Sequence, residues 1–80
     1  MHELTFDVKT IKQLSKLPNI VRERIYAKLR ASKENPFRYF ERLQDRQDYK
    51  LRVGNYRVIA DIKDNRIYVT IVSHRRNVYE

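Results

Sequence analysis

Apolar and polar residues alternate on both sides of Gly54-Asn55. A β-strand places successive side chains on opposite faces, so this alternation predicts a hairpin with a two-residue turn at Gly54-Asn55. The predicted cross-strand pairs are Val53 with Tyr56, Arg52 with Arg57 and Leu51 with Val58. One face of the hairpin would then be apolar, and the other would carry Lys50, Arg52 and Arg57.

A second turn at Asp64-Asn65 extends the predicted sheet by another strand, because both residue types tolerate turn conformations. Pairing outward from this turn sets these residues opposite each other: Ile62 and Ile67, Ala60 and Val69, Val58 and Ile71. All of them fall on the apolar face that the first hairpin predicts. We therefore expect antiparallel strands at about 48–53, 56–62 and 66–72, with Arg57 opposite Val72.

Helical spacing dominates the first half of the chain, after a segment, Leu4-Thr5-Phe6-Asp7, that suits a short strand. Apolar residues then recur every three or four positions, which predicts a brief helix buried along Val8, Ile11, Leu14 and Leu17. Pro18 favours the start of a second helix, because proline is accepted in the first turn. Its predicted buried stripe is Val21, Ile25 and Leu29. Asn35-Pro36 would end it, since a residue before proline avoids helical torsion angles.

These elements predict an α+β fold in which a two-helix hairpin packs on one face of a mainly antiparallel sheet. The sheet would contain the short N-terminal strand and three C-terminal strands, and its other face would be open. Segment 36–44 is expected to be a loop anchored by Phe37, Tyr39, Phe40 and Leu43, with exposed arginines at Arg38, Arg42 and Arg46. At 80 residues, we expect one domain spanning 1–80.

The charge balance narrows the classes of partner. Lys and Arg number 18 against 10 Asp and Glu, a net charge of +8, which predicts attraction to RNA, DNA or an acidic protein. The sequence has no cysteine, no glycine-rich phosphate loop and no serine nucleophile elbow, so we expect neither a metal nor a cofactor. It also has no apolar run of membrane-spanning length and no signal-peptide pattern, so a cytoplasmic location is expected.

The open face of the predicted sheet is the candidate site. Like charges directly opposite each other on a sheet repel, so a bound anion would explain Arg52 and Arg57 better than stability does. The predicted register also brings the C-terminal tail beside this pair. A basic cleft with aromatic edges, suited to RNA, would then contain Lys50, Arg52, Arg57, His74, Arg75, Arg76 and Tyr79.

Metal-free RNA cleavage needs a proton acceptor for the 2′-hydroxyl, cations for the charge at phosphorus and a proton donor for the leaving oxygen. Arginine stays protonated, so Arg57 and Arg75 would stabilise charge rather than accept protons. The candidates for proton transfer are Lys50, His74 and Tyr79. Structural explanations stay open for each residue. The arginines could extend into solvent, Lys50 could pair with Asp48 or Asp61, His74 could be a surface residue, and Tyr79 could close the tail onto the sheet.

Several stretches resemble the RelE branch of the RelE/ParE toxin superfamily. They are Leu43, the hairpin Tyr49-Lys50-Leu51-Arg52-Val53-Gly54-Asn55-Tyr56-Arg57-Val58-Ile59, the strand from Ile67 to Val72, and His74-Arg75-Arg76-Asn77-Val78-Tyr79. The resemblance spans essentially the whole chain. It implies a type II toxin that cuts mRNA in the ribosomal A site, without a cofactor, by attack of the 2′-hydroxyl. It also implies the ribosome and a RelB-like antitoxin as partners.

The resemblance also implies roles for single residues. Lys50 matches a catalytic lysine and Arg57 an arginine at the scissile phosphate. The tail arginine is matched by Arg75 or, with a small gap, by Arg76. Tyr79 matches a C-terminal tyrosine that stacks on a base and is a candidate acceptor of the 2′-hydroxyl proton. Arg52, His74 and Arg76 would contact RNA.

One position departs from the family pattern. Well-studied members carry lysine at the position of Asp48, so this chain has less positive charge there and we expect weaker activity. Two alternatives are a non-nuclease toxin similar to ParE, which acts on DNA gyrase, and a basic nucleic-acid-binding module. The joint presence of Lys50, Arg57, Arg75 and Tyr79 favours the nuclease.

Overall fold

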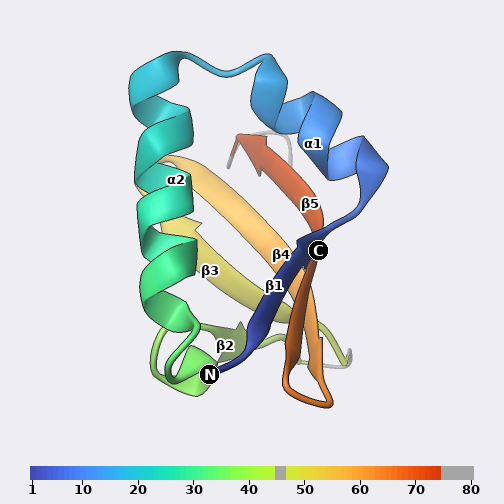
Figure 1. Cartoon of the computed structure of the whole chain (residues 1–80). Coiled ribbons are helices and arrows are strands. Elements are labelled where there is room, and N and C mark those ends of the chain that lie inside the picture. The colour runs from blue at the N-terminus through green and yellow to red at the C-terminus, as the bar shows by residue number, and fades with distance from the viewer. Residues whose placement is uncertain (45–46, 75–80) are drawn as a thin grey trace.

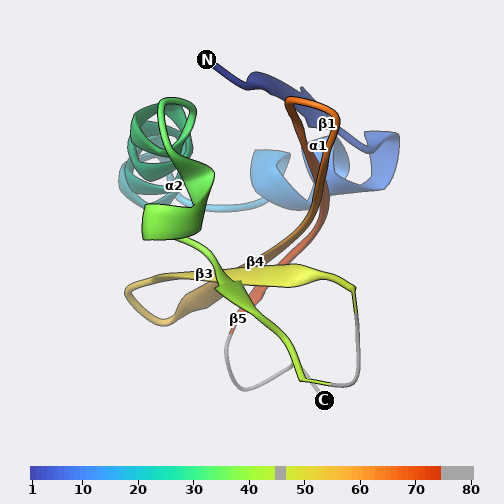
Figure 2. The same ribbon diagram turned by 90° about the horizontal axis from the view of Figure 1, so that it is seen from below.

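Two helices pack on one face of a five-stranded sheet in a computed structural model that describes residues 1–44 and 47–74 (Figure 1). The elements are β1 (Glu3–Phe6), α1 (Val8–Ser15), α2 (Asn19–Ser32), the 3₁₀ turn η1 (Pro36–Arg38), β2 (Glu41–Arg42), β3 (Tyr49–Val53), β4 (Tyr56–Lys63) and β5 (Arg66–His74). The strand order is β1-β5-β4-β3-β2, with β1 parallel to β5 and the other neighbours antiparallel. The predicted α+β fold is confirmed, and Figure 2 shows both helices on the same side of the sheet.

Both predicted turns are present, and the registers next to them are confirmed. Gly54 has φ 59°, and Asp64 and Asn65 have φ 53° and 62°. A two-residue hairpin turn needs positive φ at one or both central residues, because its twist must match that of the strands. The observed pairs are Val53 with Tyr56, Arg52 with Arg57, Leu51 with Val58, Ile62 with Ile67, and Ala60 with Val69.

The predicted pairing of Val58 with Ile71 is wrong, because β5 contains a β-bulge. Ala60 pairs with Val69, but the preceding residue of β4, Ile59, pairs with Ile71, so β5 has one extra residue there. Beyond the bulge the two faces of β5 are exchanged relative to the prediction. Val72 is in the core with 4% of its surface exposed, whereas Ile71 is 36% exposed.

Beyond the bulge, the pairing partner of Arg57 also changes. Arg57 lies opposite Ser73, and not opposite Val72 as predicted. The hydroxyl of the extra residue, Thr70, donates a 3.3 Å hydrogen bond to the carbonyl oxygen of Ile59. The carbonyl group of Ile59, which lies beside the bulge, therefore has a hydrogen-bond partner.

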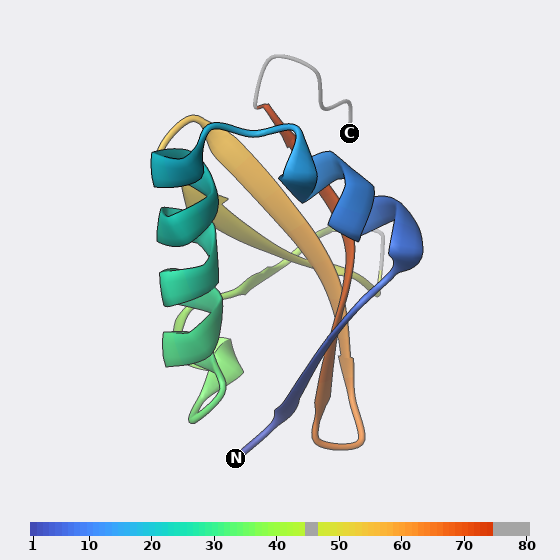
Figure 3. The ribbon, with the colours of Figure 1, turned by 45° about the horizontal axis from the view of Figure 1, so that its top comes forward.

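Buried apolar side chains fill the space between the helices and the sheet. They are Leu14, Ile25, Leu29, Phe40, Leu51, Val53, Val58, Ala60, Ile62, Ile67, Val69 and Val72. The second helix agrees with its prediction: Pro18 directly precedes it, and Ser32 ends it before Asn35-Pro36. Figure 3 shows α2 running alongside the sheet while α1 lies across the end of β5.

The predicted buried stripe of α1 is only partly correct. Leu14 is buried, but Val8 and Ile11 are exposed. The helix is rotated so that polar groups face β5. The Thr10 hydroxyl donates to the carbonyl of Val69 at 3.1 Å, and the Gln13 side-chain oxygen accepts from the backbone N–H of Val72 at 2.8 Å. Hydrogen bonds to β5 thus replace part of the expected apolar contact.

The segment predicted as an anchored loop contains η1 and the short strand β2. Phe40 is buried as predicted, but Phe37 and Tyr39 are 57% and 37% exposed and therefore are not core anchors. Leu43 is half-buried, whereas Arg38 and Arg42 are exposed as predicted, and Arg46 lies outside the described residues. No helix in the described part of the chain is long and apolar enough to cross a membrane.

Candidate functional site

Three predicted site residues lie together on the face of the sheet that is turned away from the core. Lys50 and Arg52 belong to β3, and Arg57 of β4 is the direct cross-strand partner of Arg52. Strand alternation places all three opposite to buried Leu51, Val53 and Val58. Arg52 is exposed and Arg57 is half-buried. Two guanidinium groups therefore start from adjacent backbone positions, where a bound anion would offset their repulsion.

Lys50 has an acidic neighbour that the sequence did not indicate. Glu41 of β2 lies opposite Lys50, and its Oε1 is 3.5 Å from the lysine Nζ. The Lys50 side chain is 20% exposed and that of Glu41 is 79% exposed. This partner is neither Asp48 nor Asp61, the two considered from the sequence. A two-residue strand is too short to show a periodic pattern, so the sequence carried no signal for Glu41.

The pair has a definite chemical capacity. A carboxylate accepts a proton and an ammonium group donates one, so Glu41 and Lys50 together provide both functions of acid–base catalysis. The neighbouring guanidinium groups of Arg52 and Arg57 can stabilise negative charge but do not exchange protons.

An open depression of about 480 Å³ surrounds this pair at the outer edge of β3. The residues that line it are Lys28, Arg38, Tyr39, Glu41, Lys50 and Arg52. Lys28 reaches it from α2 and donates a 3.1 Å hydrogen bond to the carbonyl oxygen of Arg52. Four cations and one carboxylate face the same space, a charge balance that favours phosphate.

Of the other predicted site residues, the structure describes only His74, and it is not brought to this face. His74 pairs with Tyr56, and their rings meet edge to face with centroids 5.1 Å apart. Tyr56 packs against the core cluster, so His74 lies on the helix-side face and not beside the arginines as predicted. The bulge in β5 causes this difference, because it shifts the register by one residue. Arg75, Arg76 and Tyr79 lie outside the described residues.

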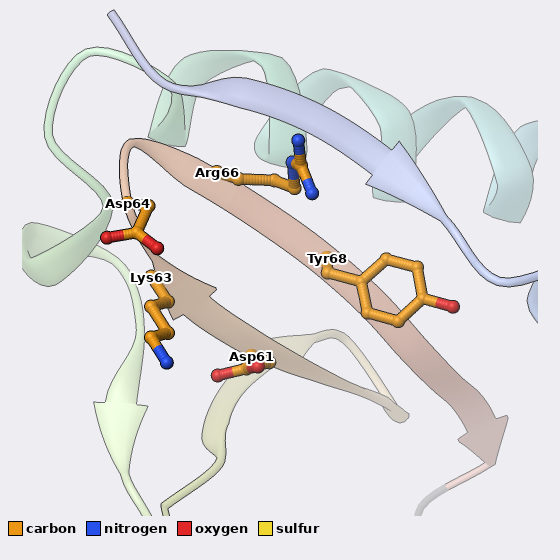
Figure 4. Close-up of a pocket in the computed structure, with 5 residues that line it drawn as sticks. All are labelled: Asp61, Lys63, Asp64, Arg66 and Tyr68. Carbon is orange, nitrogen blue, oxygen red and sulfur yellow. The ribbon is translucent and has the colours of Figure 1, made fainter.

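A second depression, of about 290 Å³, lies near the β4–β5 turn and is lined by Asp61, Lys63, Asp64, Arg66 and Tyr68 (Figure 4). Its two carboxylates and two cations balance, and Arg66 Nε is also 3.7 Å from Glu3 Oε1. This surface therefore lacks the positive excess of the first depression. Among the residues that the structure describes, no group of three or more His, Cys, Asp and Glu side chains could hold a metal ion.

Comparison with protein families matches residues 4–79 to the family described as ParE toxin of type II toxin-antitoxin system, parDE. This range includes β3 and β4, which carry Lys50, Arg52 and Arg57. No curated protein matches the sequence.

Similar solved structures include chains of three toxin–antitoxin complexes. The RelBE2 complex of Mycobacterium tuberculosis matches with a TM-score of 0.84 and 22% identity, over 92% of this chain and 98% of that one. The intact RelBE complex of E. coli matches with a TM-score of 0.79 and 29% identity, over 92% and 96% of the two chains. The RelE–RelB complex of Pyrococcus horikoshii OT3 matches with a TM-score of 0.81 and 20% identity, over 96% and 98%.

Proposed function

The chain belongs to the ParE toxin family of type II toxin–antitoxin systems, within the RelE/ParE superfamily, and we propose that this toxin cleaves mRNA in the ribosomal A site. One observation carries this proposal. The ion pair of Lys50 with Glu41 lies beside the cross-strand arginines Arg52 and Arg57, on a face of the sheet opposite the buried core. This arrangement offers a proton acceptor, a proton donor and charge stabilisation next to one another.

In the proposed reaction, the carboxylate of Glu41 accepts the proton of the substrate's 2′-hydroxyl. The 2′-oxygen forms a bond to phosphorus while the bond from phosphorus to the 5′-oxygen breaks. Lys50 donates a proton to the leaving 5′-oxygen, and Arg57 and Arg52 stabilise the added charge on the phosphoryl oxygens. The products are a 2′,3′-cyclic phosphate and a 5′-hydroxyl end.

The tail residues complete the proposed site. The family resemblance assigns Arg75 to the scissile phosphate and Tyr79 to a stacked base, with Arg76 contacting RNA. An exposed ion pair does not by itself hold a flexible RNA in an attacking conformation. We therefore expect the ribosome to orient the substrate and cleavage of naked RNA to be weak.

The proposed protein partner is a RelB-like antitoxin. The E. coli structure that matches at 29% identity is an intact toxin–antitoxin complex. With a net charge of +8, this chain would favour an antitoxin segment rich in acidic residues. Coexpression with the protein encoded beside it should relieve growth arrest.

The test is induced expression followed by mapping of mRNA ends on translating ribosomes. The wild-type protein should produce cuts at codon spacing, and Arg57→Ala or Tyr79→Ala should abolish them. Arg24→Ala, an exposed arginine on α2, removes the same charge outside the depression and should leave the cuts unchanged. Unaltered mRNA in growth-arrested cells would contradict the proposal.

The second candidate function is inhibition of DNA gyrase, and the match to the ParE family favours it. Such a toxin would act through protein contact and would not need the ion pair of Lys50 with Glu41. Plasmid supercoiling in the same cells separates the two functions. Altered supercoiling with intact mRNA would support the gyrase function, and cut mRNA with normal supercoiling would support the nuclease.

A further inference from the structure

The basic depression extends beyond the residues used in the proposed reaction, to Lys28, Arg38 and Tyr39. We propose that these three residues form a subsite for the RNA nucleotide next to the scissile linkage. Lys28 and Arg38 would hold its phosphate, and Tyr39 would stack on its base. This inference rests on the proposed nuclease function, because it identifies the path of the substrate away from Lys50 and Arg52.

The backbone that carries Arg38 and Tyr39 is fixed at both ends. Pro36 is buried and Phe40 is 4% exposed, so the two residues lie between core anchors. The backbone N–H groups of Tyr39 and Phe40 both donate to the carbonyl of Pro36, at 3.0 and 2.8 Å. Arg38 is exposed and Tyr39 is 37% exposed. A rigid turn thus presents a guanidinium group and an aromatic ring to solvent at the depression.

Lys28 approaches the same space from the other side. Its ammonium group donates to the carbonyl oxygen of Arg52 at 3.1 Å. An ammonium group has three donors, so this bond does not exhaust its capacity. This bond holds the ammonium group of Lys28 against β3, in the depression that Arg52 also lines. Lys28, Arg38 and Arg52 therefore bring three positive charges to one depression, where an anion would relieve their repulsion.

The lining favours RNA over an acidic protein segment. Of the described residues that line the depression, none is aliphatic, so an amphipathic helix would find little apolar surface. Cations together with an exposed aromatic ring are typical of single-stranded nucleic acid sites, where phosphates pair and bases stack. The volume of about 480 Å³ lies within the range of roughly 300–1,000 Å³ that is usual for ligand clefts.

The experiment measures binding of a fully 2′-O-methylated RNA oligonucleotide, which lacks the attacking hydroxyl, by fluorescence anisotropy over a range of salt concentrations. A plot of log K against log salt has a negative slope, and Arg38→Gln and Lys28→Gln should each make it less steep by about 0.7. That is the contribution of one phosphate contact with a single strand. Tyr39→Leu should weaken binding about 5- to 150-fold with little change in slope, and Tyr39→Phe should retain binding. Arg24→Gln is the matched control and should leave affinity and slope unchanged.

The outcomes separate this subsite from the proposed function. If the wild-type protein cuts mRNA on ribosomes but Arg38→Gln and Tyr39→Leu bind the oligonucleotide normally, the subsite is refuted and the nuclease stands. If the substitutions weaken binding but no cutting occurs, the nuclease is refuted and the RNA site stands. Polyglutamate serves as the acidic-protein probe. If its binding depends on Tyr39 as strongly as that of RNA, the depression is a protein site and the proposal is overturned.

Discussion

Replacing Glu41 by glutamine separates a catalytic role of the Glu41–Lys50 pair from a structural one. Glutamine keeps the size and shape of the side chain but cannot accept the 2′-hydroxyl proton. The ion pair joins atoms 3.5 Å apart, and the Glu41 side chain is 79% exposed. Exposed ion pairs of this kind contribute about 0.2–1 kcal/mol to stability. For a chain of 80 residues this corresponds to a fall in Tm of at most roughly 8 °C.

The expected effect on catalysis is far larger. Loss of a positioned proton acceptor lowers rates by about 10²–10⁴-fold, which corresponds to roughly 3–5 kcal/mol of transition-state stabilisation. The Glu41→Gln protein should therefore be folded at 37 °C and nearly inactive. Circular dichroism melting gives the stability, and single-turnover cleavage of mRNA on programmed ribosomes gives the rate.

Two controls make this result interpretable. Glu23→Gln removes an exposed carboxylate from α2, away from the depression, and should leave the rate unchanged. Lys50→Met should also abolish cleavage, and the double variant should be no slower than either single variant if the two groups act in one proton-transfer sequence. A Glu41→Gln protein that cleaves within about threefold of the wild-type rate would refute the assignment of Glu41 as proton acceptor.

Three further predictions concern the fold. Gly54→Ala should destabilise the protein by about 1–2 kcal/mol in urea unfolding, because φ at Gly54 is +59° and a residue with a Cβ is strained in that conformation. The added Cβ would have no heavy atom within 4 Å, so this backbone strain is the whole expected cost. Ile25→Val should cost about 0.5–1.5 kcal/mol in the same assay, because Ile25 is fully buried in the core. Asp7→Ala should cost about 0.5–2 kcal/mol in thermal melts, because the Asp7 carboxylate accepts the Lys9 N–H at the start of α1; an unchanged Tm would show that this cap contributes nothing.

The two hairpins could be predicted because their turns and their alternation are both local. Gly54 and the pair Asp64-Asn65 are residue types that accept positive φ, and each turn fixes the register of the strands beside it. The face shared by Lys50, Arg52 and Arg57 follows from that register alone. This part of the candidate site was therefore accessible from the sequence.

The rest depends on contacts between distant segments. The bulge next to Thr70 interrupts an otherwise regular strand pattern, and nothing in the local sequence marks it. Thr10 is buried in α1, where its hydroxyl donates a hydrogen bond to the carbonyl of Val69, 59 residues away in the sequence. Glu41 lies opposite Lys50 because β2 pairs with β3. A strand of two residues is too short for its pairing to be predicted from the sequence. The proposed proton acceptor, Glu41, therefore follows only from the observed pairing of β2 with β3.

The most direct test of the proposed reaction uses a programmed ribosome with mRNA that carries a single 2′-deoxynucleotide at the linkage the wild-type protein cuts. The mechanism predicts no cleavage at that linkage, continued cleavage in an otherwise identical all-RNA control, and a 2′,3′-cyclic phosphate on the upstream product of the control. Cleavage of the deoxy-substituted linkage at the control rate would contradict the account, because the nucleophile would then not be the 2′-hydroxyl.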